Sequence, residues 1–114
     1  MKPALLILLS LPGVHNAMNT VRSMALSQQW SREVAVIVEA DGKFHIFMDS
    51  SAVDNIDRLI TDANTRVIVH THPDNPMPSQ QDINEAIATG IPDIVISPNA
   101  MFVAMPDGSV QKLN

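Results

Sequence analysis

The spacing of apolar and polar positions in the first half of the chain predicts a strand, a helix and a hairpin. Residues 4–9 form a short, uninterrupted apolar run, which is typical of a buried strand. Residues 14–29 repeat apolar side chains near helical spacing and predict a helix. Residues 33–39 are rich in β-branched side chains, and Asp41-Gly42 separates them from the strand-like residues 43–48, which predicts a β-hairpin.

The second half of the chain continues this mixture of strands and helices. Helical spacing predicts one helix over residues 52–64 and another, after a proline-rich loop, that ends at Thr89 before Gly90 and Pro92. Apolar and β-branched runs predict four further strands, at residues 66–72, 93–97, 101–105 and 109–113. We therefore expect one α/β domain over residues 1–114, with a mixed, largely antiparallel sheet flanked by helices.

The N-terminal apolar run has a second interpretation, as part of a secretory signal spanning residues 1–17. Lys2, the apolar run and a small residue at Ala17 follow the order of such a signal. However, the run is short, Pro12 interrupts it, and His15 stands where a signal needs a small residue. The run is also too short to span a bilayer. We therefore expect a retained first strand and a cytoplasmic protein, with secretion as the alternative.

Composition and charge restrict the chemistry that this chain can perform. Of its 114 residues, 46% are hydrophobic and 17% are charged, the balance of a folded domain. A formal net charge of -5 provides no basic stripe, so nucleic acid and anionic membranes are poor partners, and a protein or peptide substrate fits better. The chain has no cysteine, so a metal site would have to use histidine and carboxylate ligands.

The sequence offers such ligands in one region. His70 and His72 stand two residues apart at the end of an apolar strand, so their side chains point to the same face. Asp82 follows in the first turn of the next predicted helix, where Ser79-x-x-Asp82 also resembles a capping box. Two histidines, one carboxylate and an open fourth position are typical of catalytic zinc, which lowers the pKa of a bound water to about 7.

The motif as a whole resembles that of a known enzyme family. His70-Thr71-His72-Pro73, a proline-containing loop and Pro78-Ser79-x-x-Asp82 resemble the signature of the JAMM (MPN) metalloproteases, in particular the prokaryotic and phage-tail members. Glu33 begins a strand where those members have their upstream glutamate, and residues 90–98 resemble the stretch that follows the motif. The loop before Asp82 is one residue shorter than is usual in the family.

The resemblance implies a fold, a cofactor and an activity. The fold would be cytidine-deaminase-like, with Zn²⁺ held by His70, His72 and Asp82. Glu33 would act as the general base and Ser79 would stabilise the oxyanion, so that the protein hydrolyses peptide or isopeptide bonds. Substrates in the family include ubiquitin-like modifiers and, in phage-like branches, suspected cell-wall or tail proteins. The chain has no room for ubiquitin-gripping insertions, which favours a compact prokaryotic or phage peptidase.

Several alternatives stay open at this level. Glu39 lies on the same face of its strand as Glu33 and is the rival general base, although its position beside Asp41-Gly42 suggests an exposed turn. His15 and His45 have no partner at a recognisable spacing and are left unassigned. The chain could also be a catalytically silent JAMM-like binding or scaffold module, or, less favoured, a structural zinc domain.

Overall fold

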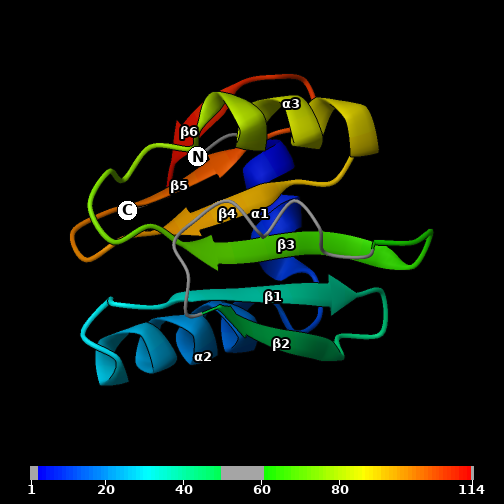
Figure 1. The fold of residues 1–114 in the computed structure, drawn as a ribbon. Helices are drawn as coiled ribbons and strands as arrows, with labels where there is room; N and C mark the ends of the chain where they lie inside the picture. Colours follow the sequence, from blue (N-terminus) through cyan, green and yellow to red (C-terminus); the bar gives the residue numbers. More distant parts are fainter. Residues whose placement is uncertain (1–2, 50–60, 114) are drawn as a thin grey trace.

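Six strands form a single mixed sheet in the order β2-β1-β3-β4-β5-β6 (Figure 1). The computed structural model describes residues 3–49 and 61–113. Neighbouring strands are antiparallel except β3 and β4, which are parallel, so the predicted mixed and largely antiparallel sheet is confirmed. The strands are β1 Glu33–Glu39, β2 Phe44–Asp49, β3 Thr65–Thr71, β4 Asp93–Ile96, β5 Met101–Ala104 and β6 Val110–Lys112.

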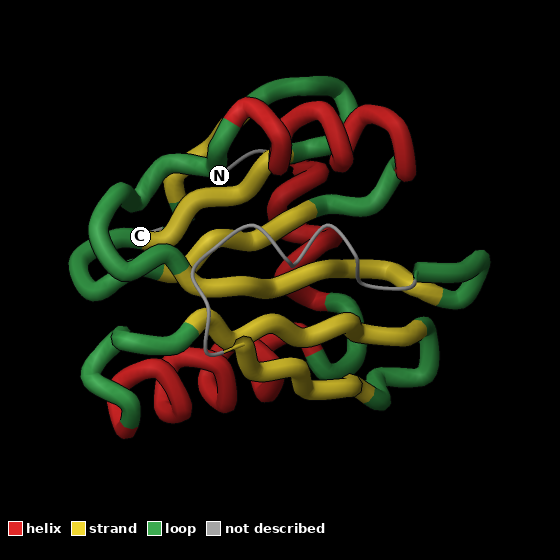
Figure 2. The backbone as a smooth tube through the Cα atoms, in the orientation of Figure 1, coloured by secondary structure: helices red, strands yellow, loops and turns green. Residues whose placement is uncertain are grey.

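Helices cover the two faces of this sheet unequally. The helices α1 (Pro3–Ser10) and α2 (Val14–Ser27) contribute buried side chains to the same core as alternate residues of β1, β3, β4 and β5. Because side chains alternate along a strand, the residues between these core positions point to the opposite face. The third helix, α3 (Gln80–Thr89), contacts β4 and β5 and lies against that opposite face (Figure 2). Its Asp82 lies 3.5 Å from His70 on that face.

The first element is a helix, so the strand predicted over residues 4–9 is wrong. Leu5 and Leu8 are buried at 4% and 3% exposure, whereas Leu6 and Ile7 between them are exposed. This spacing is that of a helix with one face against the protein, since a strand would bury every second residue. Leucine and alanine are strong helix formers, and they dominate this segment.

The other predicted elements agree with the structure apart from their ends, except for the helix predicted over residues 52–64. The strands predicted over residues 93–97 and 101–105 extend one residue beyond the ends of β4 and β5. The strand predicted over residues 109–113 is one residue longer than β6 at each end. The helix predicted over residues 52–64 lies mostly outside the described residues, and residues 61–64 are loop and turn rather than helix. Within residues 3–49 and 61–113, no single helix is long and apolar enough to cross a membrane. The pair α1 and α2 meets those criteria only when the two helices are taken together, and they are bent by 75° at their junction.

Candidate metal centre

The end of β3 presents two histidines on the sheet face opposite α1 and α2. Val67 and Val69 point into the core, so His70, which alternates with them, points to the other face. His72 follows the last residue of β3, and its backbone N–H still donates to the carbonyl of Ile96 in β4 at 3.0 Å. Both rings are therefore attached to rigid sheet backbone, with His70 at 1% and His72 at 8% exposure.

A capping box at the start of α3 brings Asp82 to these rings. The Ser79 hydroxyl oxygen accepts the Asp82 backbone N–H at 3.0 Å, and Asp82 Oδ2 accepts the Ser79 N–H at 2.8 Å. The same Oδ2 lies 3.5 Å from His70 Nε2 and 3.4 Å from His72 Nε2. The predicted capping role of Asp82 and its position beside the histidines therefore occur together.

The three donor atoms form a triangle whose size suits a small metal ion. Its third edge joins His70 Nε2 to His72 Nε2 and measures 3.1 Å. Tetrahedral zinc with bonds of about 2.0–2.1 Å separates its ligand atoms by about 3.3–3.4 Å, close to all three edges. The side chains of His70, His72 and Asp82 thus form a group that could hold a metal ion.

The hydrogen bonds behind the rings decide which nitrogens face the centre of this triangle. His72 Nδ1 lies 3.1 Å from each of two backbone carbonyl oxygens, those of Asn75 and Met77. Because a carbonyl only accepts, Nδ1 must carry the proton, and the lone pair of the neutral ring is on Nε2. His70 Nδ1 lies 2.8 Å from Asp93 Oδ1. When both rings are neutral and Asp93 accepts the His70 Nδ1–H, two lone pairs and a carboxylate converge, an arrangement that a cation between them would stabilise.

The electrostatics of the cluster favour bound positive charge. Burial by itself would lower the pKa of His70, but the charge of Asp93 and the hydrogen bonds to Asp82 and Asp93 outweigh it and hold that pKa well above its ordinary value. Burial opposes ionisation of Asp82, yet its hydrogen bonds with both histidines take its pKa far below the usual range. A metal ion at this position would compete with protonation of His70.

Glu33 lies at the same end of the sheet as the histidines. In the antiparallel register of β1 and β3, Ala35 is the partner of His70, and Glu33 shares the face of Ala35 because it is two residues away. The N–H of Val34 donates to Thr71 Oγ1 at 3.0 Å, which ties the start of β1 to the end of β3. Glu33 is 5% exposed and is not one of the three grouped ligands.

Glu39, the rival carboxylate, is at the other end of β1. Its carboxylate pairs with His45 Nε2 and accepts a hydrogen bond from Asn64 Nδ2 at 2.8 Å. Its position next to the β1–β2 turn agrees with the expectation of an exposed turn. The strand register therefore brings Glu33, and not Glu39, to the histidine end of the sheet.

Ser79 lies at the rim of a pocket beside the histidines. Its hydroxyl oxygen accepts a hydrogen bond inside the capping box, which leaves the hydroxyl hydrogen as a donor for another group. A pocket of about 280 Å³ is lined by Ser79, His72 and the loop residues Pro73, Asp74, Asn75 and Met77. A group bound in this pocket would therefore be next to one of the candidate ligands.

Asp93 contacts His70 from the first position of β4, and no motif in the sequence singles it out. The available signal was an acidic residue at the start of an otherwise apolar strand, directly after Ile91-Pro92. An acidic residue at this position is common at the start of a strand. Its contact with His70 can be inferred only when the pairing of β3 with β4 is known. The parallel register, in which Ile68 is the partner of Asp93 and His70 the partner of Val95, brings the two side chains to one face.

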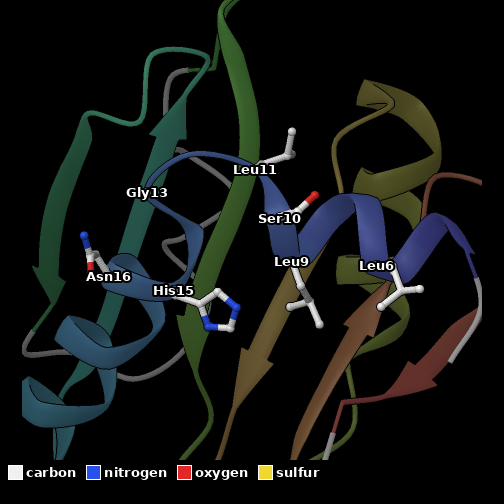
Figure 3. Close-up of a pocket in the computed structure, with 7 residues that line it drawn as sticks. All are labelled: Leu6, Leu9, Ser10, Leu11, Gly13, His15 and Asn16. Carbon is white, nitrogen blue, oxygen red and sulfur yellow. The ribbon is translucent and has the colours of Figure 1, made fainter.

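A second pocket, of about 590 Å³, lies where α1 and α2 meet (Figure 3). Leu6, Leu9 and Leu11 line it together with His15, the one titratable residue among the described side chains that line it. A single histidine beside leucines provides neither a ligand set nor an acid–base pair. The cluster of His70, His72 and Asp82 is therefore the stronger candidate site.

Comparison of the chain with protein-family models, with curated proteins and with solved structures finds no match.

Proposed function

We propose that this chain is a zinc-dependent hydrolase of peptide or isopeptide bonds, of the JAMM (MPN) type and with the cytidine-deaminase-like form of the α/β fold. The observation that supports the proposal is the triangle of His70 Nε2, His72 Nε2 and Asp82 Oδ2, with edges of 3.1 to 3.5 Å. Glu33 adds a buried carboxylate on the adjacent strand. The motif spacing that resembles the JAMM signature supports the same assignment.

The ligand set favours zinc in a catalytic role. Calcium and magnesium prefer oxygen ligands, whereas two imidazole nitrogens and one carboxylate suit zinc. Structural zinc sites are closed by four protein ligands, most of them cysteines in many cases, and this chain has no cysteine. Three grouped protein ligands leave a coordination position for water or substrate.

The residues around the ligands would divide the work of hydrolysis. Zinc bound here would acidify a water molecule and polarise the carbonyl of the substrate. Glu33 would accept the proton of the attacking water and deliver it to the leaving amine, so that one water is consumed for each bond cleaved. The free hydroxyl hydrogen of Ser79 would donate to the developing oxyanion, a contribution typically worth about 3–4 kcal/mol.

The surroundings of the centre support a peptide-like substrate. The pocket beside His72 and Ser79, about 280 Å³ in volume, is large enough for one amino-acid side chain next to the bond to be cleaved. The net charge of -5 disfavours nucleic acid as a substrate. A compact prokaryotic or phage peptidase, acting on a ubiquitin-like, cell-wall or tail-associated target, agrees best with these features.

The first test is whether the purified protein binds zinc. We expect about one zinc ion per chain by elemental analysis, as a single three-ligand site implies, and a rise in thermal stability when zinc is added. His72→Ala should abolish both effects, whereas His45→Ala, which alters an exposed histidine paired with Glu39, should preserve them. Protein that neither retains zinc nor gains stability with it would exclude the metal site.

The second test is cleavage by the zinc-loaded protein. Ubiquitin-like fusions, isopeptide-linked peptides and peptidoglycan fragments should be screened with and without a chelator. Zinc-dependent cleavage of any of them supports the hydrolase. A protein that binds zinc and cuts none of these bonds would instead be the catalytically silent binding module, for which the shortened loop before Asp82 offers a reason.

A further inference from the structure

We propose that Asp93 is a positioning residue of the metal centre, whose carboxylate holds the His70 ring with Nδ1 protonated so that Nε2 faces the metal. The inference rests on the proposed metal site, and nothing in the motif around His70 points to Asp93. The contact spans 23 positions of the chain and exists only because β4 pairs with β3 in parallel.

The geometry of the contact is that of a short, buried hydrogen bond. His70 Nδ1 lies 2.8 Å from Asp93 Oδ1, and the side chains are only 1% and 7% exposed. Removing a carboxylate from water is unfavourable unless a donor replaces the lost hydrogen bonds. His70 supplies such a donor, and both side chains project from neighbouring strands of the sheet, so their relative position is rigid.

Imidazole chemistry then gives Asp93 a specific effect. A neutral ring has one N–H, and an ionised carboxylate can only accept, so the pair fixes the proton of His70 on Nδ1. The other nitrogen, Nε2, is left with its lone pair directed at His72 Nε2 and Asp82 Oδ2. Metal-bound histidines are commonly oriented and made more basic in this way by a carboxylate behind them.

The second histidine of the centre is oriented differently. His72 Nδ1 faces the carbonyls of Asn75 and Met77, which belong to the loop between β3 and α3. Its orientation therefore depends on the conformation of that loop, whereas the orientation of His70 depends on the sheet. Asp93 thus makes one ligand independent of the loop that lines the pocket.

The test compares zinc affinity in Asp93→Asn with that in Asp41→Asn, measured by competition with a chelator. Asp93→Asn keeps the size of the side chain, but its amide can offer either its oxygen or its NH₂ group to Nδ1, so the proton is no longer fixed. We expect zinc affinity to fall by about 10-fold to 100-fold, the usual effect of losing such a contact. Asp41→Asn removes the same charge from the exposed β1–β2 turn, at the other end of the sheet from the histidines, and should change affinity little.

Nitrogen-15 NMR of the zinc-loaded wild type gives a readout that needs no variant and does not depend on activity. We expect His70 to bind zinc through Nε2 and to show a strongly hydrogen-bonded Nδ1–H, which should weaken in Asp93→Asn. Coordination through Nδ1 in the wild type would overturn the inference, even if every Asp93 variant failed to fold.

Two further results separate this inference from the proposed function. Zinc affinity that is unchanged in folded Asp93→Asn would overturn the role of Asp93 while leaving the metal site intact. A wild-type protein that binds no zinc would overturn both.

Discussion

At the scale of single residues, Glu33 distinguishes a hydrolase from a module that only binds metal. It is buried at the histidine end of the sheet but is not one of the grouped ligands, so its removal should not release the metal. Glu33→Gln keeps the size and a hydrogen-bonding head but cannot accept a proton. We expect unchanged zinc content, and turnover reduced by about 10² to 10⁴, in parallel elemental and kinetic measurements.

Glu39→Gln is the matched control for this substitution. Glu39 stands on the same strand and face, but it pairs with His45 and Asn64 next to the β1–β2 turn. Its loss should leave turnover nearly unchanged. Loss of cleavage in Glu39→Gln, with activity retained in Glu33→Gln, would show that the base is misassigned even if the zinc site is correct.

The protonation of His70 predicts how zinc binding depends on pH. The pKa of His70 is well above its ordinary value in the metal-free protein, because the charge of Asp93 and the hydrogen bonds to Asp82 and Asp93 outweigh the opposing effect of burial. Zinc must displace this proton, so its apparent affinity should rise about tenfold per pH unit until the pH passes that pKa. Chelator competition at two pH values near neutrality measures the slope, and a flat response would contradict it.

The raised pKa of His70 also predicts how the stability of the metal-free protein depends on pH, with a trend opposite to that of zinc affinity. A group whose pKa is raised by folding stabilises the native state fully below its unfolded value, about 6.5 for histidine, and loses this effect as the pH rises through the folded pKa. The contribution of His70 to metal-free stability should therefore decrease with rising pH while zinc affinity increases. Denaturant titrations with and without zinc would show the two trends.

At the scale of elements, the start of α3 has both a structural and a chemical role. The box between Ser79 and Asp82 caps the helix and also fixes the carboxylate that faces the histidines. Ser79→Ala removes the side-chain cap and should lower the free energy of unfolding by about 0.5–2 kcal/mol. Ser79→Thr keeps the cap and the hydroxyl and should lie close to wild type in the same urea titrations.

Zinc should compensate for part of this loss. The backbone N–H of residue 79 can still donate to Asp82 Oδ2 in Ser79→Ala, so the ligand remains available and bound zinc would hold the start of α3. An alanine variant as stable as the wild type without zinc would mean that packing, and not the cap, fixes this end of the helix.

At the scale of the whole molecule, the loop between α1 and α2 is held against the β1–β2 turn by two glycines. Gly13 has a φ of +81°, and a Cβ added to it would lie 2.2 Å from the carbonyl oxygen of Gly42. This contact joins the helical layer to the end of the sheet opposite Glu33. A side chain at position 13 would have to separate two backbone segments.

Gly13→Ala is therefore expected to destabilise the fold more than Gly90→Ala does. Gly90 also has a positive φ, of +71°, but an added Cβ would meet nothing within 4 Å. In Gly90→Ala the free energy of unfolding should fall by only about 1–2 kcal/mol, because alanine is disfavoured in a left-handed backbone conformation. In Gly13→Ala it should fall by more. Thermal unfolding of the two variants measures the difference, and equal losses would mean that the loop moves away without penalty.

The features that depend on local periodicity follow from the amino-acid sequence. Residues two apart on a strand share a face, so the convergence of His70 and His72 is predictable from their spacing alone. The box at Ser79 and Asp82 likewise follows from a four-residue pattern that needs only its own helix. These rules act over a few residues, and that is why β1 to β6, α2, α3 and the grouping of His70, His72 and Asp82 were predictable.

The features that depend on which segments pack together come from the tertiary structure. Residues 4–9 are apolar throughout, so their pattern fits a strand or a buried helix, and packing of Leu5 and Leu8 in the core selects the helix. Glu33 and Glu39 are an even number of residues apart on β1, so their side chains share a face. Only the register of β1 with β3 shows that Glu33 is the one at the same end of the sheet as His70. Asp93 meets His70 through strand pairing across 23 positions, a contact that no local pattern encodes.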